Sequence, residues 1–188
     1  MSKSWRVIDI VTATVLAVAS GLLFAVWNQI GGPAFELIDK TTPGLGGLIT
    51  GIWLIGGVLG ALVIRKPFAA IYVELLAAVV SAVLGSQWGI TTLASGVAQG
   101  LGVELVFLLF AYRRFSLPVA VLSGVGAGWG AFILELFLTP NLPKGIGYNA
   151  IYLVSLSVSG AALAGALGFF LVRGLAATGA LDRFAVSR

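Results

Sequence analysis

Six long apolar segments, separated by short breaks of glycine, proline or charged residues, constrain this chain more than any other feature of its sequence. They lie at 7–30, 44–64, 67–85, 91–112, 117–138 and 148–173. At about 1.5 Å per residue, a helix of such length crosses a hydrocarbon core of roughly 30 Å. The pattern predicts an all-α, polytopic integral membrane protein whose six transmembrane helices form one compact domain over residues 1–188.

The composition agrees with a membrane protein and excludes most catalytic chemistry. Of the 188 residues, 59% are hydrophobic and 10% are charged, and the mean hydropathy is +1.07, far from that of a soluble domain. The absence of cysteine and histidine removes disulfides, thiolate nucleophiles, most zinc sites and the usual general base. We therefore expect a protein that is not an enzyme and that uses neither a metal nor a cofactor.

Basic residues predict the orientation of the chain in the membrane. With both termini in the cytoplasm, nine of the eleven Lys and Arg residues face inward, which is the positive-inside pattern. This accounts for the net charge of +4 without nucleic acid. The inward residues would be Lys3, Arg6, Arg65, Lys66, Arg113, Arg114, Arg173, Arg183 and Arg188. The apolar run after the basic start continues to Ile30 without a cleavage site, so we expect a retained first span.

Polar and aromatic residues gather near the outer ends of the predicted spans. Glu135 lies about 6 Å below the outer end of the fifth span, and amides and rings come from the first, fourth and sixth spans. Such a set fits a pocket for a flat, nitrogen-rich, cationic molecule. The alternative is an interfacial aromatic belt with an acid that reaches the headgroups. The candidate binding residues are Trp27, Asn28, Gln99, Glu135, Tyr148, Asn149 and Tyr152.

Two further acids, Glu74 and Glu104, lie at similar depth in the inner half of the predicted bundle. One interpretation is that they are structural groups that form hydrogen bonds inside the bundle. In the other, Glu74, Glu104 and Glu135 line the pathway of a small ion-coupled carrier or channel. Both interpretations stay open at this level.

Small residues recur four apart along the spans and predict close helix packing. The first helix has a continuous ridge of Ala13, Ala17, Gly21 and Ala25, which could pack internally or receive a partner's helices. The chain contains no G-x-x-x-x-G-K-[ST] loop for nucleotide phosphates. If it takes part in active transport, the energy source must be another subunit.

Two stretches of the sequence carry a resemblance to a known family. The opening SWRVIDIVTATVLAVASGLLFAVWNQI and the later RKPFAAIYVELLAAVVSAVLGSQWG resemble the YkoE family of S components, the substrate-binding subunits of energy-coupling factor (ECF) transporters. That family is associated with thiamin and its hydroxymethylpyrimidine precursor. The likeness covers nearly the whole chain.

The resemblance implies a high-affinity vitamin-binding subunit of an ATP-driven importer in a prokaryotic cell membrane. It implies as partners a transmembrane coupling subunit and ATP-binding subunits, with the Ala13 and Ala17 face of the first helix docking on the former. Substrate would enter from outside beneath a capping loop at 31–43. The resemblance leaves open which is bound: thiamin, hydroxymethylpyrimidine or another vitamin.

Overall fold

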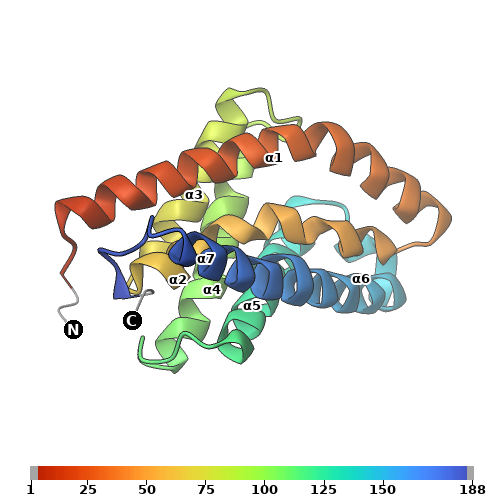
Figure 1. The fold of residues 1–188 in the computed structure, drawn as a ribbon. Coiled ribbons are helices and arrows are strands. Elements are labelled where there is room, and N and C mark those ends of the chain that lie inside the picture. The colour runs from red at the N-terminus through yellow and green to blue at the C-terminus, as the bar shows by residue number, and fades with distance from the viewer. Residues whose placement is uncertain (1–3, 186–188) are drawn as a thin grey trace.

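The computed structural model describes residues 4–185, and every regular element in that part of the chain is helical. The order is α1 (Val7–Thr41), a 3-10 helix η1 (Leu45–Leu54), α2 (Ile55–Ile64), α3 (Ala69–Val83), α4 (Thr91–Leu109), α5 (Leu117–Leu138), a short 3-10 turn η2 (Leu142–Lys144), α6 (Gly145–Ser159), a π-helical stretch η3 (Gly160–Ala166) and α7 (Leu167–Ala177). The beginning of α1 and the end of α7 lie at the same end of the bundle (Figure 1).

Five segments within residues 4–185 are long and apolar enough to cross a membrane, and α3 is a shorter apolar helix. The segment Leu45–Ile64 consists of η1 followed by α2, and the segment Leu142–Ala177 consists of η2, α6, η3 and α7. The six predicted segments are therefore all helical. The third is the shortest: α3 has 15 residues, about 22 Å at the α-helical rise.

The segment at 31–43 differs from the expected loop, because α1 continues as a helix of 35 residues to Thr41. Pro33 removes one backbone donor within it, and Figure 1 shows α1 curving over the bundle. The helix persists because side chains on its last turns are held by α6. The Phe35 and Tyr152 rings meet edge to face at 6.1 Å, and Asp39 accepts a hydrogen bond from Tyr148.

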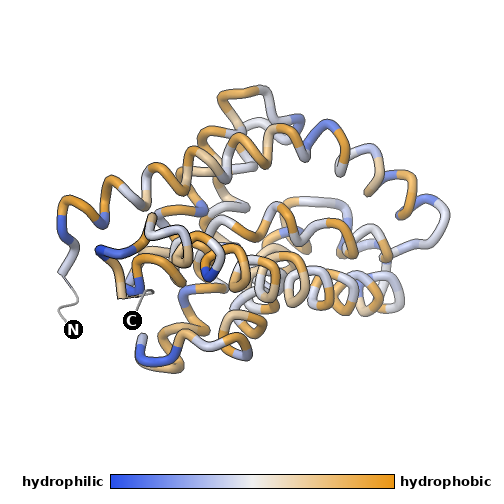
Figure 2. Tube along the Cα trace, in the orientation of Figure 1, coloured by the Kyte–Doolittle hydropathy of each residue, from blue (hydrophilic) through white to orange (hydrophobic). Residues whose placement is uncertain are grey.

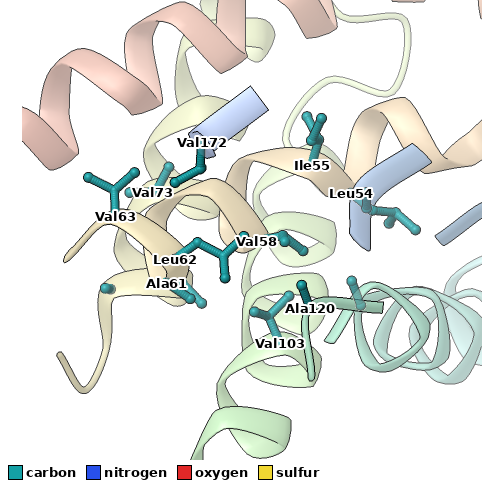
Figure 3. Close-up of a cluster of buried hydrophobic side chains, with 14 of the residues drawn as sticks. Leu54, Ile55, Val58, Ala61, Leu62, Val63, Val73, Val103, Ala120 and Val172 are labelled. Atoms are coloured by element: carbon teal, nitrogen blue, oxygen red, sulfur yellow. The ribbon is translucent and has the colours of Figure 1, made fainter. Parts of the chain in front are cut away.

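Helix α2 lies at the centre of the bundle. Nine of its ten residues are buried, and Figure 3 shows the cluster of aliphatic side chains around it, from α2, α3, α4, α5 and α7. Val58 and Val63 are fully inaccessible to solvent. Figure 2 shows that hydrophobic residues run along the trace of the helices, α1 included, and many of them are exposed. On α1, Val15 and Val26 are 62% and 60% exposed, which is expected of a surface covered by lipid.

Glycines let α5 approach its two neighbours closely, as the small-residue spacing predicts. A Cβ atom built at Gly126 would lie 2.5 Å from the carbonyl oxygen of Gly102 on α4. One built at Gly124 would clash with the backbone of Gly160 in η3. A methyl group at either position would force the backbones apart.

The small ridge on α1 packs inside the protein. Ala13 and Ala17 have no exposed surface, and a Cβ at Gly21 would lie 2.8 Å from the carbonyl oxygen of Ala77 on α3. The expectation that Ala13 and Ala17 present a docking face to a partner is therefore not met in this structure. Their small side chains serve the contact between α1 and α3, because larger ones would separate the two helices.

Three buried acids satisfy the backbone N–H groups at the beginnings of helices, which have no partner within their own helix. Asp9 accepts the N–H of Arg6 at 2.7 Å, at the start of α1. Glu74 accepts the N–H of Gly57 near the start of α2. Glu104 accepts the N–H groups of Phe68 and Ala70 at 2.6 and 3.1 Å, at the start of α3.

Glu104 also accepts a hydrogen bond from the Tyr112 hydroxyl group. Burial and this bond raise the pKa of the Tyr112 phenol above its ordinary value. Both oxygens of Glu104 are thus occupied by groups of the protein itself. The structural interpretation of this acid is confirmed.

We predict that Glu104→Ala destabilises the protein by about 2–4 kcal/mol, because three donors lose their acceptor. Thermal unfolding in detergent measures this. Tyr112→Phe removes only one donor and should cost less, about 1 kcal/mol. Wild-type stability in Glu104→Ala would contradict the capping role.

We also predict that Ala17→Trp lowers the stability of the isolated protein by about 1–3 kcal/mol or more, because an indole does not fit between α1 and α3. Val15→Trp, on the exposed face of the same helix, is the matched control and should leave the melting temperature nearly unchanged. Equal stability of the two variants would mean that Ala17 is exposed and does not pack against α3.

Candidate functional site

A cavity of about 360 Å³ lies between the helices, at the end opposite the beginning of α1. Its volume falls in the range of small-molecule sites, about 300–1,000 Å³. Side chains from α1, η1, α3, α4, α5, η2 and α6 line it, together with the turn between α3 and α4. The polar and aromatic residues among them are Phe24, Asn28, Phe35, Glu36, Thr50, Trp53, Glu74, Ser81, Gln87, Trp88, Thr91, Thr92, Ser95, Gln99, Glu135, Thr139, Asn141, Lys144 and Tyr152.

Glu135 supplies a carboxylate to the wall formed by α5. One of its oxygens, Oε2, accepts a hydrogen bond of 2.6 Å from the Tyr152 hydroxyl group. The other oxygen has no hydrogen-bond donor among the described residues. Glu135 therefore differs from Asp9, Glu74 and Glu104, because it accepts no backbone N–H and keeps one oxygen available to a ligand.

An amide and two indole rings form another part of the wall. Asn28 is buried, donates to Ser81 Oγ at 3.0 Å and accepts from the Trp53 indole N–H at 2.8 Å. The Trp53 and Trp88 rings meet edge to face, with centroids 5.3 Å apart. The Asn28 bonds fix the indole of Trp53, so its ring is a rigid surface against which a flat molecule can pack.

Glu74 and Gln99 lie together on the α3 and α4 side of the cavity. With the Gln99 amide nitrogen directed toward its two acceptors, it donates to Glu74 Oε1 and to the Trp53 carbonyl oxygen, each at 3.1 Å. The cavity thus contains two buried carboxylates in different settings. Glu74 accepts hydrogen bonds from donors of the protein itself, whereas one oxygen of Glu135 can still accept a hydrogen bond from a ligand.

The last turns of α1 cover one side of the cavity, where Phe35 and Glu36 line it. Asp39 fastens this part of α1 to the start of α6. It accepts hydrogen bonds from the Tyr148 hydroxyl at 3.0 and 3.1 Å and forms an ion pair of 3.6 Å with Lys144. Lys144 lines the cavity, but its charge is partly balanced by Asp39, which does not line it.

Four of the seven candidate binding residues line the cavity: Asn28, Gln99, Glu135 and Tyr152. The other three, Trp27, Tyr148 and Asn149, do not line it, and each has a partner elsewhere. The Trp27 indole donates to the Ile49 carbonyl oxygen at 3.2 Å. Tyr148 stacks on Tyr152 with centroids 5.8 Å apart, and Asn149 donates to the carbonyl oxygens of Asn141 and Gly145. They support the residues around the cavity.

Sequence reasoning left Glu74, Ser81 and Trp53 out of the candidate site. A signal for the first two exists, since Glu74, Ala78 and Ser81 share one face of α3 at helical spacing. Depth along the helices alone groups Glu74 with Glu104 and not with the outer polar residues. Glu104 does not line the cavity, so the three acids of the carrier hypothesis do not share one site.

We predict that Asp39→Asn loosens the end of α1, because the ion pair to Lys144 is lost and the Tyr148 bond is weakened. Hydrogen exchange of the backbone amides at 34–41 should accelerate roughly 5- to 30-fold, as expected for the loss of about 1–2 kcal/mol of local stability. Glu36→Gln is the matched control, because its ion pair with Lys40 is exposed. Equal exchange in both variants would contradict the role of Asp39.

Comparisons with known proteins place this geometry among membrane transport components. A family model described as "ABC-type cobalt transport system, permease component" matches residues 8–130. The chain is 37% identical over 186 residues to the "Putative HMP/thiamine permease protein YkoE" of Bacillus subtilis (strain 168), covering 99% of this chain and 92% of that protein. A solved structure described as "Crystal structure of an S-component of ECF transporter" superposes with a TM-score of 0.90 at 36% identity, covering 98% of this chain and 92% of that one.

Proposed function

This chain belongs to the YkoE-like S components of ECF transporters, and we propose that its cavity binds thiamin or the hydroxymethylpyrimidine precursor of thiamin. Its family makes it the non-catalytic, substrate-binding subunit of an importer. The ligand is inferred from the relative's name together with the chemistry of the cavity.

The observation that carries the proposal is the unoccupied oxygen of Glu135 beside aromatic and amide groups. Thiamin combines a thiazolium cation with a flat aminopyrimidine ring. Glu135 would balance the cation, and the ring would pack on Trp53 or Trp88. Gln99 and Asn28 are close enough to the cavity to meet ring nitrogens, although their present bonds would have to rearrange or be shared.

The partners and the orientation belong to the same proposal. The chain has no nucleotide-binding loop, so ATP hydrolysis would take place on ATP-binding subunits that act through a transmembrane coupling subunit. The cavity would face the outside of a prokaryotic cell membrane, with both termini in the cytoplasm. The last turns of α1 would cover the bound ligand, in the place where the sequence suggested a capping loop.

Isothermal titration of the purified protein tests the ligand and the role of Glu135 together. We expect Glu135→Gln to weaken thiamin binding by roughly 10- to 100-fold, the scale of about 1–3 kcal/mol for a lost bond to a charged group. Hydroxymethylpyrimidine has no thiazolium, so its affinity should change much less. This pair of ligands separates charge balance from a general disturbance of the site.

Glu36→Gln is the control for the variant, since Glu36 lies at the same cavity but is exposed and paired with Lys40. Unchanged thiamin affinity in Glu135→Gln would remove this carboxylate from the site. If the wild-type protein bound neither compound, the ligand would be wrong, whatever the variants do. Thiamin flux into liposomes that hold this chain alone would favour a carrier over a binding subunit.

A further inference from the structure

A second cavity, of about 210 Å³, lies at the other end of the bundle, where α2 ends and α7 approaches its last turns. Its lining residues are Leu62, Arg65, Phe115, Phe169, Val172 and Arg173. Leu62 and Val172 are almost fully buried and belong to the aliphatic cluster of Figure 3. The cavity therefore has an apolar floor, aromatic sides and two arginines.

Arg65 is held rigidly beside this cavity. Its guanidinium carbon lies 4.8 Å from the centroid of the Phe115 ring, which stacks on Phe107 at 5.2 Å. It donates from Nε to the Leu62 carbonyl oxygen at 3.1 Å and from Nη1 to the Ala185 carbonyl oxygen at 2.8 Å. These bonds use two of its five N–H donors. The remaining three have no acceptor among residues 4–185.

Arg173 contributes the second positive charge from α7. Its guanidinium carbon lies 5.9 Å from the Phe169 ring centroid, and its side chain is exposed. Neither Arg65 nor Arg173 forms an ion pair with a carboxylate in the described part of the chain. Two guanidinium groups around one partly desolvated space repel each other, and an anion between them would offset that repulsion. The cavity is therefore complementary to a small group with negative charge.

We propose that this cavity binds the phosphate group of an acidic membrane lipid. Guanidinium groups pair with phosphate oxygens through two parallel N–H bonds, and basic pockets between transmembrane helices are suited to acidic headgroups. The neighbouring surface of α7 favours a lipid over a free anion. Phe170, Leu171 and Leu175 are 57%, 45% and 41% exposed there, so acyl chains can lie along this helix while the headgroup occupies the cavity.

Native mass spectrometry of the full chain in detergent tests the proposal, with dioleoyl phosphatidylglycerol as the acidic probe and dioleoyl phosphatidylcholine as the zwitterionic one. We expect phosphatidylglycerol to be retained at least about five-fold better, the factor for roughly one basic residue at an acidic headgroup. Arg173→Gln should reduce that retention to a similar extent. Because Arg173 is exposed, this variant avoids the folding contacts that Arg65 makes.

Arg183→Gln is the matched control, since Arg183 is also exposed and basic but does not line the cavity. The proposal is overturned if the two variants retain phosphatidylglycerol equally, or if the wild-type protein holds both lipids alike. A competition arm with millimolar inorganic phosphate distinguishes the two sources of phosphate. Displacement of the lipid by inorganic phosphate would overturn the lipid assignment in favour of a small-anion site.

Discussion

Backbone N–H groups that leave water must find acceptors within the protein, and this requirement organises the bundle. The chain meets it with carboxylates: Asp9 at the start of α1, Glu74 at α2 and Glu104 at α3. Lys66, from the turn before α3, forms an ion pair with Asp9 and ties α1 to that turn. The three acids join each helix beginning to a neighbouring element, so they fix how α1, α2, α3 and α4 meet.

Glu135 is outside this arrangement, and this leaves it available for the binding role that we propose. The one hydrogen bond of its carboxylate within residues 4–185 comes from Tyr152, whose ring packs against those of Phe35 and Tyr148. The end of α1 is thereby connected to the carboxylate through aromatic contacts. A ligand bound to Glu135 would contact Tyr152, which also packs against Phe35 in the last turns of α1. The position of the last turns of α1 and the binding of a cation at Glu135 can therefore depend on each other.

The cavities at the two ends of the molecule differ in their charged groups. The large cavity has three carboxylates and one ammonium group, that of Lys144, in its walls. The small cavity between α2 and α7 has guanidinium groups without a carboxylate partner in residues 4–185. The same residues, Arg65 and Arg173, were assigned by the sequence to the cytoplasmic side as determinants of topology. Orientation and lipid binding are compatible uses of one set of charges, because both follow from attraction to acidic headgroups.

The sequence by itself determined the helical class, the number of apolar segments and four of the residues that line the cavity, because hydropathy and the period of a helix are local properties. It did not determine the contacts among distant segments. Whether Ala17 faces a partner or α3, whether 31–43 is a loop or the end of α1, and whether Glu74 joins Glu135 or Glu104 were decided by tertiary structure alone. In each case the deciding group lies on another helix, and a single helix carries no information on which neighbour its faces will meet.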